Sequence, residues 1–335
     1  DYNRYIESIK PNLDLDPKEW YFKSDNNYTY MLEHSDQKMG NKYLKVIKSD
    51  FPDKYETNKE LLISLCHKND LYGKTIKYFY NDFTECSPTN LRYILHSFLI
   101  LKYINSNNLS NLDIIEIGGG YGGLAFYLMK ISPIFDIKVK SYSIFDLFEA
   151  SQLQDRYLNA LKMHNYQCLQ IENYQNLETD SFLISNFAYS EIPSELQKQY
   201  SKKIINPFTS HGFLTWNTSK IYEFVRDKHI SIEREKPPLA STVTNKSNWY
   251  KLAAITQTTE DPETYIESIE VDGVTTETEH EVPGTSHPIM RLSLEKRMGE
   301  EMRFTEPADN LDLAQGLSIE VRTYKVRDKA QFEGR

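Results

Sequence analysis

The sequence predicts an α/β fold, in which helices cover a parallel sheet, with an N-terminal helical region and a β-rich C-terminal segment. Three observations support this prediction. Short apolar runs alternate with amphipathic stretches of roughly 10 to 15 residues in the middle of the chain. One of these runs continues directly into a glycine-rich turn. After Pro238 the apolar residues recur at every second position, which is typical of antiparallel strands.

We divide the chain into residues 1–108, 109–238 and 239–335, which we expect to be a helical substrate or cap region, the sheet domain and a β-rich segment of unknown role. The composition changes at the last boundary, because only three of the 24 tyrosines follow it. The clearest helix of the first region follows Ser87 and Pro88, which suit the N-cap and the first helical position. We expect this helix to extend to about Asn105.

In the sheet domain, apolar runs predict the strands Asp113–Ile117, Ile137–Phe145, Cys168–Ile171, Phe182–Ser185, Phe213–Trp216 and Ile230–Glu233. Amphipathic stretches predict the helices Gly122–Ile131, Phe148–His164, Glu195–Ile205 and Ser219–Lys228. This alternation implies right-handed crossovers and a parallel sheet.

Asp272-Gly273 lies between apolar runs and indicates a β-hairpin in the last segment. We expect further strands within Ile289–Leu294 and Leu317–Val326, with a short helix near Leu294–Met302.

The bulk composition excludes several classes of partner. A formal net charge of -9 and a pI near 5.5 argue against nucleic acid and anionic membranes, which attract proteins with excess lysine and arginine. The sequence contains no apolar run long enough to cross a bilayer. Its three cysteines lack CxxC spacing, so we expect reduced thiols and a cytoplasmic location.

The strongest motif is the turn Gly118–Gly123, in which five of six residues are glycine. It follows an apolar strand, and glycine lets the backbone turn tightly and approach a ligand closely. The next helix directs free N–H groups at whatever fills the turn. Gly118, Gly120 and Gly123 also match the GxGxxG dinucleotide pattern, so an NAD(P)-dependent oxidoreductase is the first alternative.

Two acidic residues narrow the choice of cofactor. Glu116 precedes the first glycine by two positions, where a carboxylate suits the positively charged amino group of a methionine moiety and would repel a pyrophosphate. Asp146 ends the second strand, where an acid can accept hydrogen bonds from both hydroxyls of a ribose. Asp146 has the alternative role of capping the helix that begins at Phe148. We therefore predict S-adenosyl-L-methionine as the cofactor.

Several segments resemble the sugar O-methyltransferase family, whose members are class I S-adenosylmethionine-dependent methyltransferases with a Rossmann-like fold. These segments are Ile114–Ala125, Tyr142–Leu147, Ile184–Glu191, Ile232–Pro237, Tyr78–Phe83 and Ser87–Tyr93. The resemblance covers roughly residues 70–238 and implies transfer of a methyl group to a hydroxyl of a sugar or glycan. In this family one more strand completes the sheet. Either Trp249–Thr256 or a later strand supplies it here, or the tail is unrelated.

The resemblance also implies roles for individual residues. Those expected to bind the cofactor are Glu116, Gly118, Gly119, Gly120, Tyr121, Gly122, Asp146, Leu147, Ser185 and Asn186. Glu191 is the first candidate for the base that takes the hydroxyl proton, and His211 is the second. The candidates for substrate contact are Tyr80, Asp82, Arg92 and Tyr189, although the aromatic rings among them also suit simple packing of the N-terminal helices.

Two alternatives to this interpretation remain open in the sequence. A divalent metal held by Asp146, Asn186 and Glu191 has no further support, because the chain lacks a His/Cys cluster, and we predict no metal. A non-enzymatic cofactor-binding or assembly protein, acting through its β-rich tail, is the alternative from outside the enzymes.

Overall fold

A computed structural model describes residues 2–174, 177–178, 180–217, 228–237, 248–254, 264–271, 274–281, 323–326 and 331–333. The chain divides into two compact units, one within residues 1–225 and 231–252, the other within 226–230 and 253–335. The first unit therefore extends beyond residue 238, where the composition changes. Among the described residues, no helix has the length and apolar content that a membrane crossing requires.

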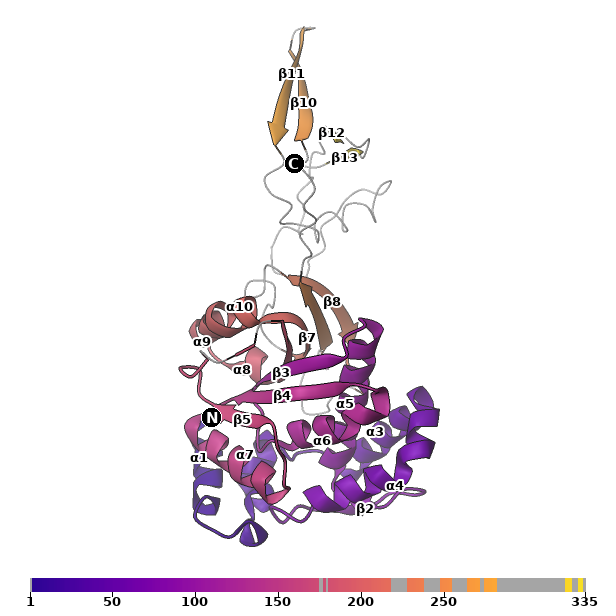
Figure 1. The fold of residues 1–335 in the computed structure, drawn as a ribbon, viewed down its shortest axis with the longest axis vertical. Coiled ribbons are helices and arrows are strands. Elements are labelled where there is room, and N and C mark those ends of the chain that lie inside the picture. Colours follow the sequence, from indigo (N-terminus) through magenta and orange to yellow (C-terminus); the bar gives the residue numbers. More distant parts are fainter. Residues whose placement is uncertain are drawn as a thin grey trace. The chain divides into compact units, whose positions relative to one another are not determined.

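A seven-stranded sheet forms the centre of the first unit (Figure 1). Its strands are β3 (Asn111–Ile117), β4 (Lys138–Phe145), β5 (Tyr166–Leu169), β6 (Ser181–Asn186), β7 (Thr209–Trp216), β8 (Lys228–Arg234) and β9 (Asn248–Ala254). They are ordered β5-β4-β3-β6-β7-β9-β8, and the four pairs from β5 to β7 are parallel. The connections reverse direction beside β3, which opens a crevice at the carboxyl ends of the strands. The predicted Rossmann-like α/β fold is confirmed.

The strand expected after Pro238 is β9, inserted between β7 and β8. Trp249 and Leu252 of β9 are buried, and the Trp249 ring lies 6.1 Å from the ring of Phe213 on β7. The hydroxyl of Tyr103 donates a hydrogen bond to the Leu252 carbonyl at 3.0 Å. Of the alternatives left open by the sequence, the segment Trp249–Thr256 is the one that supplies the strand.

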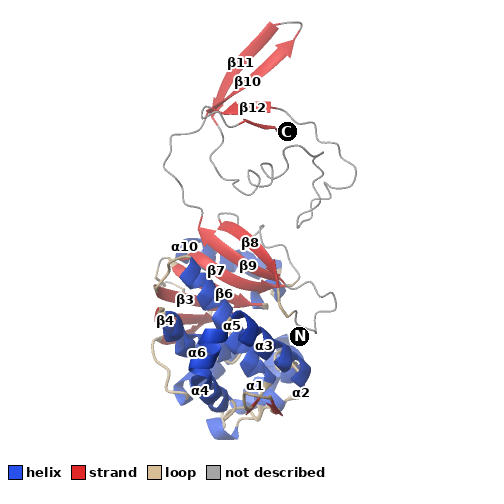
Figure 2. Cartoon of the chain, turned by 90° about the vertical axis from the view of Figure 1, so that its right-hand side faces the viewer, coloured by secondary structure: helices blue, strands red, loops and turns tan. Residues whose placement is uncertain are grey.

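Helices cover both faces of this sheet. They are α1 (Tyr2–Ile9), α2 (Asn26–Met31), α3 (Gln37–Asp50), α4 (Pro52–Asn69), α5 (Pro88–Ser106), α6 (Gly123–Ile131), α7 (Phe148–Ala160), α8 (Ala188–Glu191), α9 (Ser194–Tyr200) and α10 (Asn206–Phe208). Helices α5, α6 and α7 lie on one face, and α9 and α10 lie on the other (Figures 1 and 2). The helix predicted over 219–228 falls outside the described residues, except for Lys228, which begins β8.

Helix α5 begins at Pro88 as predicted, and Ser87 occupies its N-cap position. Its side chain makes no capping hydrogen bond; instead, the backbone N–H of Ser87 donates to the Asp70 carboxylate at 2.9 Å. Since α5 leads into β3 through a short loop, it runs opposite to that strand. Its first turns therefore lie at the carboxyl edge of the sheet, where α/β folds bind ligands.

The N-terminal helical region and the glycine turn share one aromatic core. The ring of Tyr121, within the turn, lies 5.0 Å from Tyr157, 5.5 Å from Phe22 and 6.0 Å from Tyr93. Each such pair contributes about 0.5 to 1.5 kcal/mol beyond the area that it buries. The contacts of Tyr121 with Phe22 and Tyr93 therefore hold the turn against residues 2–106.

The second unit contains a four-stranded sheet of order β11-β10-β12-β13. Its strands are β10 (Thr264–Val271), β11 (Val274–Glu281), β12 (Thr323–Val326) and β13 (Gln331–Glu333). β10 and β11 pair antiparallel up to Val271 and Val274, which agrees with the hairpin predicted at Asp272-Gly273. The loop itself, the strand expected at Ile289–Leu294 and the helix expected at Leu294–Met302 lie outside the described residues.

Candidate functional site

The glycine turn connects the carboxyl end of β3 to α6. Gly118 has φ +76° and Gly120 has φ +59°, conformations that residues with a Cβ adopt only with strain. A Cβ on Gly118 would lie 2.0 Å from the Cβ of Ala188, so the turn packs tightly against the segment after β6. A Cβ on Gly120 would meet only Leu32, at 3.4 Å. The backbone at Gly120 is thus the more open part of the turn.

Glu116 lies on β3, which runs between β4 and β6, and its side chain is buried. The hydroxyl of Tyr142 donates a hydrogen bond to its carboxylate at 2.9 Å. Burial raises the pKa of Glu116 to about 8, and the Tyr142 hydrogen bond opposes this shift. A buried carboxylate of this kind is stabilised by a cationic partner.

Asp146 follows β4 and faces the glycine turn. Its carboxylate accepts hydrogen bonds from the Leu147 backbone N–H and the Gln154 amide, both at 2.8 Å. Burial raises the pKa of Asp146 to about 6, and these donors, with the backbone N–H groups of Gly119 and Gly120, oppose the shift. The two acids predicted from the sequence therefore both lie next to the same turn.

Gln154 is a site residue that the sequence analysis missed. Its amide also donates to the Gly120 carbonyl at 2.9 Å and so links Asp146 to the turn. Gln154 is buried on α7 beside Leu153 and Tyr157. A polar residue within the apolar stripe of a predicted helix was the signal that could have identified it.

The carboxyl end of β6 lies beside the turn. The Ser185 hydroxyl donates to the Ile117 carbonyl at 2.8 Å and accepts from the backbone N–H of Tyr189 at 3.0 Å, so Ser185 holds β6 against β3. The Asn186 side chain accepts a hydrogen bond from Arg92 at 3.2 Å. The next residue, Phe187, has φ +69°, and backbone strain of this type is concentrated at functional sites.

The structure separates the two candidate bases. Glu191 ends α8, just beyond β6, and its exposed carboxylate accepts a hydrogen bond from Asn217 at 2.8 Å. His211 pairs with Phe182 near the beginning of β7, five residues before that strand ends. At about 3.3 Å per residue, His211 is roughly 16 Å from the carboxyl end of the strand. A residue that begins a parallel strand lies at the edge opposite to the carboxyl ends of the strands, so of the two candidate bases only Glu191 lies near the glycine turn.

The four candidates for substrate contact also have different positions. Tyr80 is buried against Gly40 of α3, and Asp82 is exposed in the turn between β1 (Tyr78–Phe79) and β2 (Glu85–Cys86). Tyr189 is buried against Trp216, and its hydroxyl donates to the Gln197 carbonyl at 3.2 Å, which gives it a packing role in place of the expected acceptor contact. Arg92 reaches the carboxyl end of β6.

The N-terminal helices contribute contacts that the sequence did not indicate. The hydroxyl of Tyr5 on α1 donates to the Gly120 carbonyl at 3.2 Å, across 115 positions of sequence. Leu32, just after α2, lies against the same glycine. The first helices of the chain therefore cover the open part of the glycine turn.

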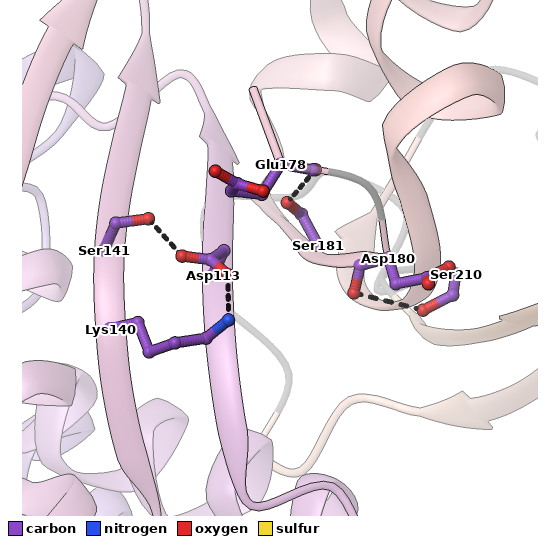
Figure 3. Close-up of polar contacts among 7 residues, drawn as sticks. All are labelled: Asp113, Lys140, Ser141, Glu178, Asp180, Ser181 and Ser210. Carbon is purple, nitrogen blue, oxygen red and sulfur yellow. Dashed lines mark hydrogen bonds and ion pairs between the residues drawn. The ribbon is translucent and has the colours of Figure 1, made fainter. Parts of the chain in front are cut away.

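At the opposite edge of the sheet, polar groups join neighbouring segments (Figure 3). Asp113 forms an ion pair with Lys140 at 2.6 Å and accepts from the Ser141 hydroxyl at 2.6 Å. The hydroxyls of Ser181 and Ser210 donate to backbone carbonyls of residues 178 and 180. Within the described part of the chain, no group of three His, Cys, Asp or Glu residues could hold a metal ion. The contacts in Figure 3 lie at the amino edge of the sheet, so the candidate site is at the opposite, carboxyl edge.

Neither a protein-family model nor a curated protein matches the sequence. Several solved structures are similar to the chain. Magnesium protoporphyrin IX methyltransferase from Synechocystis PCC 6803, with bound SAM, is 12% identical, covers 50% of this chain and 82% of its own, and gives a TM-score of 0.36. An S-adenosylmethionine-dependent methyltransferase from Clostridium acetobutylicum ATCC 824 is 16% identical, with coverages of 55% and 71% and a TM-score of 0.30. The fold assignment itself rests on the strand order of the sheet.

Proposed function

We propose that this chain is an S-adenosylmethionine-dependent methyltransferase. The observation that carries the proposal is the pair of acids next to the glycine turn, the buried Glu116 and Asp146. A buried carboxylate beside the turn favours a ligand with a cationic group and disfavours a pyrophosphate. This charge pattern separates the proposal from a nicotinamide-dependent oxidoreductase.

The residues of the turn fit the proposed cofactor. Glu116 would bind the ammonium group of the methionine moiety, and Asp146 would accept hydrogen bonds from the ribose hydroxyls. The open backbone at Gly120 would lie along the ligand, since a Cβ there meets little but Leu32. When bound, the cofactor supplies a sulfonium methyl group that an acceptor oxygen can attack in line.

Binding tests this proposal directly. Calorimetry should detect binding of S-adenosylhomocysteine and give no signal with NAD, and bound ligand should raise the melting temperature by mass action. Binding of NAD alone would favour the oxidoreductase. Absence of binding by either nucleotide would favour a protein that acts through its second unit.

We further propose that the acceptor is a hydroxyl of a sugar or glycan, with Glu191 as the base that takes its proton. The support is the resemblance of residues 70–238 to sugar O-methyltransferases and the place of Glu191 just beyond β6, on the side where the crevice opens. Its exposed carboxylate is held by Asn217, which limits its orientation. A positioned base contributes roughly 10² to 10⁴-fold to such a transfer.

The Glu191→Gln variant tests the role of the base. We expect it to lower the single-turnover rate of methyl transfer by roughly 10² to 10⁴-fold and to leave the affinity for S-adenosylhomocysteine unchanged. Glu195→Gln is the matched control, because Glu195 is also exposed and is paired with Lys198 on α9. Acceptors are first identified by transfer of labelled methyl from S-adenosylmethionine to a panel of sugars and nucleotide sugars. A rate equal to that of the control would show that Glu191 is not the base.

A further inference from the structure

Within the described part of the chain, Arg92 is a buried cation that forms no ion pair with a carboxylate. Its side chain is only 6% exposed, and its one hydrogen bond is donated by Nη2 to the Asn186 amide oxygen. Its Nε has no hydrogen-bond partner. Among the described residues, no carboxylate oxygen lies within 4.0 Å of the guanidinium. Because an unpaired buried charge is costly, a bound anion would stabilise the guanidinium at this position.

The guanidinium is placed at the first glycine of the turn. In the parallel pairing of β3 with β6, Glu116 lies beside Ile184. Two residues further along each strand, Gly118 and Asn186 are therefore side by side. Adjacent strands are about 4.8 Å apart. The guanidinium therefore lies at the same end of the proposed cofactor site as Glu116.

Packing holds the Arg92 side chain in this position. Its guanidinium carbon lies 5.2 Å from the centre of the Phe187 ring, a cation–π distance. Ala188 fills the space beside Gly118, which keeps this segment against the turn. With Nη2 donating to Asn186, the Nε–H is the buried guanidinium donor without a partner among the described residues, and it can donate to an oxygen of a bound anion.

The ionisable groups around Arg92 are engaged elsewhere. Glu33 accepts a hydrogen bond from Thr89 at 2.6 Å, and Glu235 lies 3.8 Å from His96. Burial, together with the charge of Arg92, lowers the pKa of His34 to about 4, so this imidazole is neutral at pH 7. Glu33 has a coulombic interaction with Arg92, but among the described residues no ion pair within 4.0 Å joins a carboxylate to the guanidinium.

We propose that Arg92 binds the α-carboxylate of the methionine moiety of S-adenosylmethionine, while Glu116 binds the ammonium group of the same moiety. This inference rests on the proposed function. The two groups of the amino acid are separated by one carbon, and the register places both binding residues at one end of the turn. A guanidinium fork matches the geometry of a carboxylate, which a lysine does not. Arg92 is thereby assigned to the cofactor and not to the sugar acceptor.

A comparison of two ligands tests the assignment. S-adenosylhomocysteine carries the amino-acid group, and methylthioadenosine keeps the nucleoside without it. In calorimetry, Arg92→Gln should weaken the binding of S-adenosylhomocysteine by about 10- to 100-fold and leave methylthioadenosine binding unchanged. Arg92→Lys should give a smaller loss. Arg4→Gln is the matched control, because it removes the charge of an exposed arginine on α1.

Other results would overturn the inference. Equal losses for both ligands would assign Arg92 a structural role. A rise in the KM of the acceptor, with unchanged affinity for S-adenosylhomocysteine, would assign it to an anionic group on the acceptor. If Arg92→Gln does not fold, the wild-type protein decides: it should bind decarboxylated S-adenosylmethionine more weakly than S-adenosylmethionine, and equal affinities would refute a carboxylate contact. A wild-type protein that binds no S-adenosylhomocysteine would instead overturn the proposed function.

Discussion

Glu116 couples the stability of the protein to pH. Its pKa lies near 8 in the folded chain, against an ordinary value of 4.5, and burial is the main cause. Between these values the folded state holds a proton that the unfolded state has released. The free energy of unfolding therefore falls as pH rises through this window, and the penalty is fully present above about pH 8. A bound ammonium group would relieve this penalty.

The Glu116→Gln variant should remove this pH dependence. We expect its free energy of unfolding, from denaturant titrations, to fall less between pH 5 and pH 8 than that of the wild type, and its affinity for S-adenosylhomocysteine to be lower at both values. The wild type should also release a proton on binding at pH 7, measured by calorimetry in buffers of different ionisation enthalpy. Glu195→Gln should behave like the wild type. Equal slopes for all three proteins would contradict the assigned pKa.

Gly118 and Gly120 should respond differently to a methyl group. Gly120→Ala should cost about 1 to 2 kcal/mol of stability, the strain of its positive φ, and should weaken cofactor binding because the Cβ enters the open part of the turn. Gly118→Ala should cost more, since its Cβ would also collide with Ala188 at 2.0 Å. Denaturant titrations and calorimetry of both variants check this order. A less stable Gly120→Ala would show that the turn packs differently.

Local sequence patterns were sufficient to predict most strands of the first unit. Apolar runs located the strands of the first unit to within a few residues, because burial on both faces of a parallel sheet leaves a continuous apolar signal. The insertion of β9 between β7 and β8 was beyond such patterns, since strand order depends on contacts distant in sequence. The apolar run that predicted β7 did not indicate that His211 lies near the beginning of this strand, away from its carboxyl end.

The interior position of β9 determines how far the chain can be shortened before the first unit loses its fold. A chain ending at residue 245 loses an interior strand together with buried Trp249 and Leu252, and we expect it to be insoluble or to lack a cooperative unfolding transition. A chain ending at residue 254 keeps β9 and should unfold cooperatively and bind S-adenosylhomocysteine. Circular dichroism during heating, with calorimetry, compares the two. A folded, ligand-binding chain of 245 residues would show that β9 is dispensable.

At the scale of the whole molecule, Asn69 joins the N-terminal region to the sheet domain. Its side-chain oxygen accepts hydrogen bonds from Tyr157 at 2.6 Å, Tyr121 at 3.1 Å and Lys23 at 3.2 Å. Its amide group donates to Asn90 of α5. Tyr157 is 88 positions from Asn69 in the sequence. The sequence showed only a chain rich in tyrosine and asparagine, because a network of this kind is defined by tertiary contacts.

Replacing Asn69 should therefore weaken both stability and cofactor binding. Asn69→Ala removes the side-chain acceptor shared by two tyrosine hydroxyls and the buried Lys23 ammonium, which should cost about 2 to 5 kcal/mol in the free energy of unfolding. Lys23 keeps its hydrogen bond to the backbone carbonyl of residue 69, at 3.1 Å in the wild type. Burial already lowers the pKa of Lys23, so loss of an acceptor disfavours its charged form further. Since Tyr121 belongs to the glycine turn, the affinity for S-adenosylhomocysteine should also fall.

A double-mutant cycle separates the lysine from the tyrosines. If the acceptor lost by the ammonium dominates the cost, adding Lys23→Met to Asn69→Ala should restore part of the lost stability, because an apolar side chain in this place needs no acceptor. Asn58→Ala is the control, since Asn58 donates only to the Lys54 carbonyl within α4 and should change stability little. Strictly additive effects of the two changes would place the cost on Tyr121 and Tyr157. A neutral Asn69→Ala would mean that the two regions are held together by aromatic packing alone.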